Sequence, residues 1–124
     1  MLPMASVKSD SGKLQTNSSP RERRYTMRYP FSADAEILSL KSGTRVGGVT
    51  SDLSLGGCFV CTRLSLEIGT RIRLTLKRKN QTVTMLAVVR VAKPGTGMGL
   101  EFLEVAPDSG ETLQGWIAGI RESR

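Results

Sequence analysis

The chain has 124 residues, 18 Lys and Arg against 11 Asp and Glu, a formal charge of +7 and no histidine. This length allows one domain of about 100 residues with one modest core. The charge favours anionic partners such as nucleic acid, a nucleotide or an acidic membrane surface. Because histidine is the commonest general base and metal ligand, its absence makes the composition more typical of a binding protein than of an enzyme.

The N-terminal region is polar. Residues 1–20 mix Ser, Thr, Asn, Lys and Gly without hydrophobic periodicity, which predicts a disordered tail. The region has no apolar segment of the secretory type. The longest strictly apolar run, residues 85–89, is far too short to span a bilayer. We therefore expect a soluble, cytoplasmic protein that does not insert into a membrane.

An arginine-rich arm, residues 21–30, follows the tail and carries four arginines within eight residues. Arg is always charged, and its planar fork binds phosphate and stacks on flat rings. Pro30 disfavours helix at Tyr29, so the arm is expected to be extended or turn-like. The pattern predicts an anion-binding arm.

Short strand patterns separated by turn signals begin after the arm. Gly47 and Gly48 indicate a bulge within one of these strands. Six short strands without an intervening helix predict an all-β fold, either an antiparallel barrel or a sandwich. Closing the sheet removes its open edges, so we expect the barrel. The expected strands cover residues 35–40, 45–53, 58–62, 71–77, 82–92 and 97–103.

The last segment has helical periodicity and is predicted to form a helix over about residues 108–121. Asp108, followed three residues later by Glu111, is expected to cap its start. Trp116 is expected to anchor the helix on the barrel. The apolar stripe consists of Leu113, Trp116, Ile117 and Ile120.

Two cysteines, Cys58 and Cys61, lie three positions apart in a predicted strand. On a strand these positions point to opposite faces, which suits neither a disulfide between them nor a shared metal. A lone C-x-x-C is weak evidence for zinc or redox chemistry. We expect free thiols in a reducing compartment, and no metal.

A second polar stretch combines Asp52 and Ser54 with the glycine pair Gly56 and Gly57. On an extended backbone Asp52 and Ser54 share a face, and the glycines allow a flat group to approach closely. A carboxylate beside a hydroxyl can read the N–H edge of a base. Taken alone, the pattern is more typical of a turn in which an Asp or Ser side chain caps a hairpin.

Taken together, the arm and this stretch form R-x-x-x-R followed, about two dozen residues later, by D-x-S-x-x-G. With the strand-rich sequence up to residue 103, they resemble the PilZ domain family of cyclic di-GMP receptors. The resemblance implies a six-stranded antiparallel barrel with a C-terminal helix, in a domain covering residues 21–124. It also implies a role in bacterial second-messenger signalling. The motif positions are Arg24, Arg28, Asp52, Ser54 and Gly57.

The resemblance implies roles for the arginines. Arg24 and Arg28 would contact the phosphates and guanines of cyclic di-GMP through hydrogen bonds and stacking. Arg23, directly before the motif, is typical of relatives that bind an intercalated dimer of the ligand. The ligand phosphates would neutralise the arm and fold it over the barrel, which would create a new surface for a downstream protein partner.

The resemblance also implies roles for the barrel residues. Asp52 would accept hydrogen bonds from the guanine edge, and Ser54 would add another. Gly57 would leave room for the purine, with Gly56 beside it. Because Ser54 has no recognisable base, the sequence favours a binding module over an enzyme and predicts no cofactor.

An alternative interpretation is a basic β-barrel that binds nucleic acid non-specifically. A row of cations on one predicted strand and in the turn after it supports this alternative. The scarcity of aromatic residues, with three Phe, two Tyr and one Trp, argues against a stacking platform for bases. The row consists of Arg71, Arg73, Lys77, Arg78 and Lys79.

Overall fold

The structure is a computed structural model that describes residues 27–122. The predicted tail, residues 1–20, and most of the predicted arm, with Arg23 and Arg24, lie outside the described residues.

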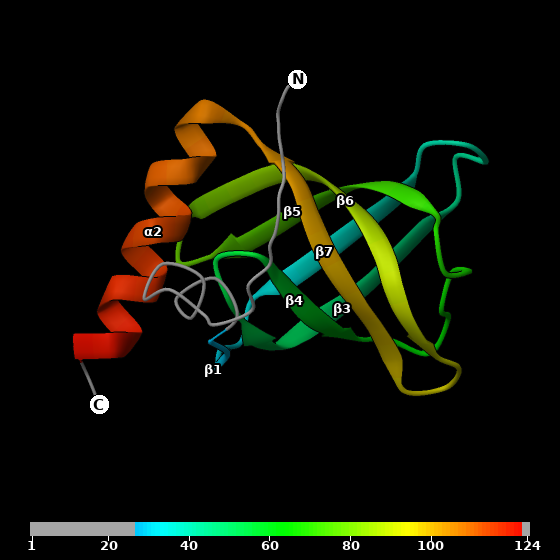
Figure 1. Cartoon of the computed structure of the whole chain (residues 1–124), viewed down its shortest axis with the longest axis horizontal. Helices are drawn as coiled ribbons and strands as arrows, with labels where there is room; N and C mark the ends of the chain where they lie inside the picture. Colours follow the sequence, from blue (N-terminus) through cyan, green and yellow to red (C-terminus); the bar gives the residue numbers. More distant parts are fainter. Residues whose placement is uncertain (1–26, 123–124) are drawn as a thin grey trace, which may run out of the picture.

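In the described part of the chain, seven strands are followed by one helix (Figure 1). These elements are β1 (Tyr29–Pro30), β2 (Asp34–Ser39), β3 (Arg45–Leu53), β4 (Gly57–Cys61), β5 (Arg71–Arg78), β6 (Gln81–Lys93), β7 (Gly97–Val105) and α2 (Pro107–Glu122).

Six of the strands close into an antiparallel barrel, as the sequence predicted. The order is β3-β2-β5-β6-β7-β4, and β4 pairs again with β3 to complete the ring. β1 lies outside the ring and pairs with the end of β3, Tyr29 opposite Leu53 and Pro30 opposite Asp52. The sequence did not predict β1, because two residues that end in proline have no periodic signal.

The barrel interior is filled by alternate side chains of its strands. In β5, Ile72, Leu74 and Leu76 are fully buried, and Ile37 of β2 lies opposite Leu74. Burying each such side chain stabilises the fold by roughly 1.5–3 kcal/mol relative to leaving it exposed. The alternation in the sequence therefore predicted the inner face of the barrel correctly.

The bulge expected at Gly47 and Gly48 is wrong. Both glycines keep a regular register with β2. The register of β3 instead shifts against β4 between Thr50 and Asp52. A Cβ on Gly48 would overlap the carbonyl oxygen of Cys61, so glycine is needed here for close strand packing.

The helix begins one residue earlier than expected. The N–H of Gly110 donates to the carbonyl of Ala106 over 3.0 Å, so Pro107 is the first helical residue. The predicted capping pair of Asp108 and Glu111 is therefore wrong, because both lie inside the helix. Asp108 still lies in the first turn, where its charge complements the helix dipole.

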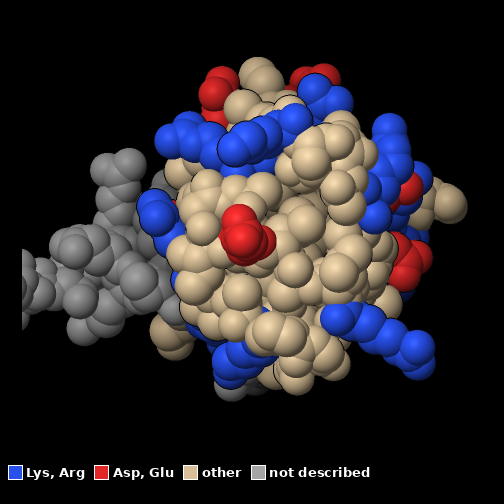
Figure 2. Space-filling model, turned by 90° about the vertical axis from the view of Figure 1, so that its right-hand side faces the viewer, with Lys and Arg blue, Asp and Glu red and all other residues tan. Residues whose placement is uncertain are grey.

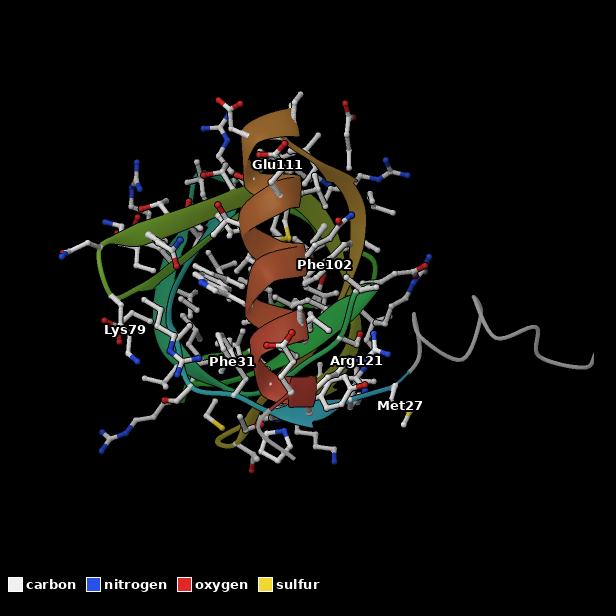
Figure 3. The ribbon with its side chains drawn as sticks, turned by 90° about the vertical axis from the view of Figure 1, so that its left-hand side faces the viewer. Met27, Phe31, Lys79, Phe102, Glu111 and Arg121 are labelled. Carbon is white, nitrogen blue, oxygen red and sulfur yellow. The ribbon has the colours of Figure 1, made fainter. Side chains whose placement is uncertain are left out.

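Helix α2 covers one end of the barrel, and Trp116 anchors it there as predicted. Figure 3 shows the helix crossing this end with Phe31 beside it. The rings of Phe31 and Trp116 have centroids 5.2 Å apart, and the indole Nε1 of Trp116 donates to Gln81 Oε1 over 2.8 Å. Leu113 and Ile117 are buried in the same core. Between residues 27 and 122, no helix is long and apolar enough to cross a bilayer.

Candidate functional site

The segment that follows Arg28 is fastened to β3. Tyr29 pairs with β3 and is buried. The buried hydroxyl of Thr50 accepts from the N–H of Ala33 over 2.9 Å and donates to the carbonyl of Phe31 over 2.7 Å. These bonds fix the chain directly after Arg28, so its position at the barrel surface is defined by the fold.

The bulge in β3 turns Asp52 toward the outside of the barrel. Thr50 and Leu53 are buried, and the extra residue between them leaves two successive positions outside, the second of which is Asp52. Asp52 Oδ1 accepts from Arg28 Nη1 over 2.6 Å and from the N–H of Phe59 over 3.1 Å. The two charged side chains are 50% and 29% exposed, so their ion pair contributes at most about 1 kcal/mol of stability. Its main effect is to orient the guanidinium.

Ser54 shapes the turn between β3 and β4. Its side chain is buried, and its Oγ accepts from the N–H groups of Gly56 and Gly57 over 3.2 and 3.0 Å. The same hydroxyl donates to the carbonyl of Gly57 over 3.1 Å. This is the turn-capping arrangement that the sequence offered as an alternative. In this structure the single O–H donor of Ser54 is directed into the turn.

The glycine pair lets β4 approach β7 closely. A Cβ on Gly57 would overlap the carbonyl oxygen of Leu100 on β7. The carbonyl of Gly56 accepts from the N–H of Phe102 over 2.9 Å. Gly57 is thus required by strand packing, whether or not a purine also lies against it.

A surface hollow of about 670 Å³ lies beside this turn. Arg28 and the glycine pair line one side of it, and Arg90 and Glu101 also line it. Arg90 is the extra residue where the register of β6 shifts against β7, and its Nε donates to Glu101 Oε1 over 2.5 Å. The hollow therefore has a second ion pair besides that of Arg28.

The PilZ domain model matches residues 22–119. The chain belongs to the PilZ domain family.

Solved structures share the PilZ fold with this chain at low sequence identity. The PilZ domain of CeSA from a cellulose-synthesizing bacterium has 20% identity and a TM-score of 0.60, over 77% of this chain and 99% of that one. The Bacillus subtilis inhibitor of motility, MotI/DgrA, has 20% identity and a TM-score of 0.66, over 78% of this chain and 50% of that one. The PilZ domain of Escherichia coli YcgR, solved with c-di-GMP, has 17% identity and a TM-score of 0.64, over 82% and 93%. A search of curated proteins found no match.

The described part of this PilZ domain brings most of the predicted ligand-binding residues to one side of the barrel. Two predicted residues, Arg23 and Arg24, lie outside the described residues. Those around the hollow or in contact with its lining are Arg28, Asp52, Ser54, Gly56 and Gly57.

Sequence reasoning missed Arg90 and Glu101 in this PilZ domain. Arg90 is the one charged residue in the stretch from 83 to 92, and an isolated charge in an apolar strand is a signal that could have been used. Its outward position depends on the register shift in β6, which no local pattern reveals. The pairing with Glu101 depends on which strands are neighbours.

The two cysteines lie on opposite faces of β4, as predicted, with Cys58 buried and Cys61 exposed, and both are free. Burial raises the pKa of the Cys58 thiol to about 12; the Asp52 carboxylate adds to the increase, and Arg28 opposes it. Within residues 27–122, no three His, Cys, Asp or Glu side chains are grouped so that they could hold a metal.

Proposed function

We propose that this PilZ domain is a receptor for cyclic di-GMP. The observation that carries the proposal is the 2.6 Å ion pair between Arg28 and Asp52 at the hollow beside Gly56 and Gly57. Both members of the pair are signature positions of the family, and they come from the arm and from the barrel. The PilZ domain of E. coli YcgR, which has the same fold, was solved with c-di-GMP.

The groups at the ion pair suit a ligand with two phosphates and two guanines. A guanidinium has five N–H donors, and Asp52 uses one of those of Arg28. The remaining donors suit phosphate oxygens or the O6 and N7 atoms of guanine. Asp52 Oδ1 is occupied by Arg28 and Phe59, whereas its Oδ2 can accept from the N–H edge of guanine.

Arg90 supplies a second contact across the hollow in this proposal. Its side chain is well exposed, and its Nε is fixed by Glu101. A guanidinium plane held in this way offers a flat cationic surface on which a purine stacks. Arg28 and Arg90 would then contact the ligand from two sides.

The residues before Arg28 form the proposed clamp. Arg24 is four positions before Arg28, and four residues of extended chain span about 13 Å. Ligand phosphates would draw Arg23 and Arg24 toward the hollow, and Arg23 would favour an intercalated ligand dimer. The ordered arm would then form part of a new surface for a downstream protein.

Hydrogen–deuterium exchange of the arm tests the clamp. We expect slower amide exchange in residues 21–30 when cyclic di-GMP is added, and no change with GTP at the same concentration. The Arg28→Ala variant is expected to lose this protection while the exchange of β5 and β6 stays as in the wild type. Unchanged exchange of the arm at saturating ligand would refute the clamp.

In this proposed function the chain is a binding module with no enzymatic activity and no cofactor. We place it in the cytoplasm, because free thiols persist in reducing compartments.

A further inference from the structure

The barrel end opposite α2 carries the connection between β4 and β5, residues 62–70, which contains no strand or helix. This loop is nevertheless fixed to its neighbours. The hydroxyl of Ser65 donates to the carbonyl of Gly97 over 2.8 Å, and the N–H of Gly69 donates to the carbonyl of Val89 over 2.8 Å. Its backbone is therefore preformed, and the positions of its side chains are set by the fold.

The loop carries apolar side chains that remain exposed instead of packing into the core. Leu66 packs against the core, but Leu64 and Ile68 on either side of it are 56% and 65% exposed. Leu40, at the turn between β2 and β3, is 47% exposed. Burial of such a side chain is worth roughly 1.5–3 kcal/mol, and residues 27–122 bury none of the three fully. Clustered exposed apolar residues mark interaction surfaces.

A groove of about 700 Å³ separates the loop from the turn after β2. Leu40 and Lys41 line one side, and Leu66, Ile68 and Arg71 line the other. Glu67 also lines the groove. The groove is wide enough to receive large side chains, so this surface is shaped for a partner that inserts anchors into it.

Cations surround this end of the barrel, and they lack acidic partners. Figure 2 shows a broad surface made mostly of uncharged residues, with one acidic group near its middle. Lys and Arg predominate around its edge, where a few acidic groups also lie. Among the described residues, the salt bridges are those of Arg28 and Arg90, and neither involves the edge of this surface. The basic rim of the surface consists of Lys41 and Arg71, which line the groove, and of Arg63 and Lys93, whose backbone carbonyls accept hydrogen bonds at the same end of the barrel. The Nζ of Lys93 lies 5.8 Å from the centroid of the Phe59 ring.

We propose that this end of the barrel docks an acidic segment of a partner protein, with large apolar side chains inserted into the groove beside Leu40 and Ile68 and covering the exposed Leu64 next to it. The basic rim, which forms no salt bridge among the described residues, selects the negative charge, and the groove receives the anchors. A second copy of the chain fits poorly, because a symmetric dimer would place two basic rims face to face. A bilayer fits poorly too, because Glu67 would be pressed into an anionic, apolar surface.

The docking surface is separate from the hollow at Arg28. Along β4, the hollow lies at Gly57, opposite Glu101, and the loop begins after Cys61, opposite Gly97. Four residues of extended strand correspond to about 13 Å. The proposal therefore does not depend on cyclic di-GMP.

Selection from a phage-displayed library of random peptides on the immobilised full chain tests this proposal. Counter-selection uses a Leu64→Ser/Ile68→Ser double variant, and the matched control is Leu86→Ser/Leu103→Ser, which changes exposed apolar residues on β6 and β7 near the α2 end of the barrel. We expect enriched peptides with net negative charge and at least two large apolar residues. Synthesised as free peptides, they should bind at least tenfold more weakly to the Leu64→Ser/Ile68→Ser variant and to Arg71→Glu than to the wild type. Their affinity for the control variant should equal that for the wild type.

Four results would overturn the proposal. One is enrichment of neutral or basic peptides, and another is equal binding to the wild type and the Leu64→Ser/Ile68→Ser variant with both shown folded. A third is sedimentation with phosphatidylglycerol vesicles that is lost in that variant, which would make the surface a membrane contact. The fourth is a wild-type dimer in analytical ultracentrifugation that becomes monomeric in the same variant.

Discussion

The glycines of this chain differ in whether the surrounding structure has room for a larger side chain. At Gly57 a Cβ would overlap the carbonyl oxygen of Leu100, and backbone on a closed barrel cannot move away easily. At Gly115 and Gly119, on α2, a Cβ would meet nothing within 4 Å. The helix glycines are thus a cost in helix propensity that packing offsets, whereas Gly57 is required by the fold.

Alanine substitution at these positions should therefore have opposite effects on stability. We expect Gly57→Ala to lower the free energy of unfolding by about 1–3 kcal/mol, because it forces strands β4 and β7 apart. Gly115→Ala should raise it by about 0.5–1 kcal/mol. Urea denaturation of both variants measures the difference. Equal effects at the two sites would contradict the packing explanation.

The buried thiol of Cys58 should make the fold less stable at high pH. Burial, with a smaller effect of Asp52, raises its pKa from 9.0 to about 12. Above pH 9 the unfolded chain releases the thiol proton while the folded chain keeps it. The stability that the Cys58 thiol contributes to the fold is therefore fully present below pH 9 and is lost as the pH rises toward 12. The expected decrease is up to about 1.4 kcal/mol per pH unit.

Urea denaturation at about pH 8 and about pH 10.5 tests this expectation against Cys58→Ala, which lacks the thiol. The wild type should lose more stability than the variant between the two pH values. Cys61 is exposed and provides a matched thiol, so Cys61→Ala should retain the wild-type pH dependence. Equal losses in the wild type and Cys58→Ala would show that the buried thiol contributes nothing.

At the scale of elements, an aromatic contact joins the segment after the arm to helix α2. Phe31 follows β1, and its ring lies against Trp116 and under the guanidinium of Arg78, 4.2 Å from the ring centroid. The chain just after Arg28 is therefore held by β3 on one side and by the helix on the other. Loosening the helix should disturb the residues that position Arg28.

The hydrogen bond of Trp116 offers a specific test of how the helix is held. Replacing Gln81 by Leu removes the acceptor of the buried indole N–H, which should cost about 1–3 kcal/mol of stability. Trp116 is the only tryptophan, so its fluorescence reports the helix directly. Gln81→Glu keeps an acceptor and serves as the control. Unchanged stability in Gln81→Leu would mean that water replaces the bond.

Local pattern was sufficient for some elements of this fold and insufficient for others. The alternation that buries Ile72, Leu74 and Leu76 is a property of one strand, so the sequence predicted it correctly. The bulge was placed at Gly47 and Gly48 because glycine is a common local signal, but the real register shift is set by the pairing of β3 with β4. The helix begins at Pro107, because the fixed φ of proline suits the first helical position. The prediction instead relied on the acidic pair that follows Pro107.

The candidate site was predictable to a similar extent. Arg28 and Asp52 were identified because they belong to a spaced motif, and the structure shows them in contact. Arg90 and Glu101 belong to different strands, and their meeting depends on the closure of the barrel and on the irregular register of β6 and β7. Ser54 shows a third case, since its residue type suits both a ligand contact and a turn, and only the structure shows the hydroxyl within the turn.

At the scale of the molecule, the positive charge is spread over several surfaces. The hollow at Arg28 has two ion-paired arginines, whereas the outer face of β5 carries Arg71, Arg73 and Lys77 without acidic partners among the described residues. The latter face is the basis of the nucleic-acid alternative. A specific nucleotide receptor and a non-specific nucleic-acid binder differ in which of these surfaces the ligand needs.

Isothermal titration of cyclic di-GMP into the wild type, Arg24→Ala and Arg21→Ala distinguishes these functions most directly. Arg21 lies outside the R-x-x-x-R register, so its replacement removes the same charge without touching the motif. A receptor predicts saturable binding in the wild type and Arg21→Ala and its loss in Arg24→Ala, and two ligands per chain would support the role of Arg23. No heat with folded wild type, or equal binding in all three proteins, would contradict the receptor and favour non-specific binding of polyanions.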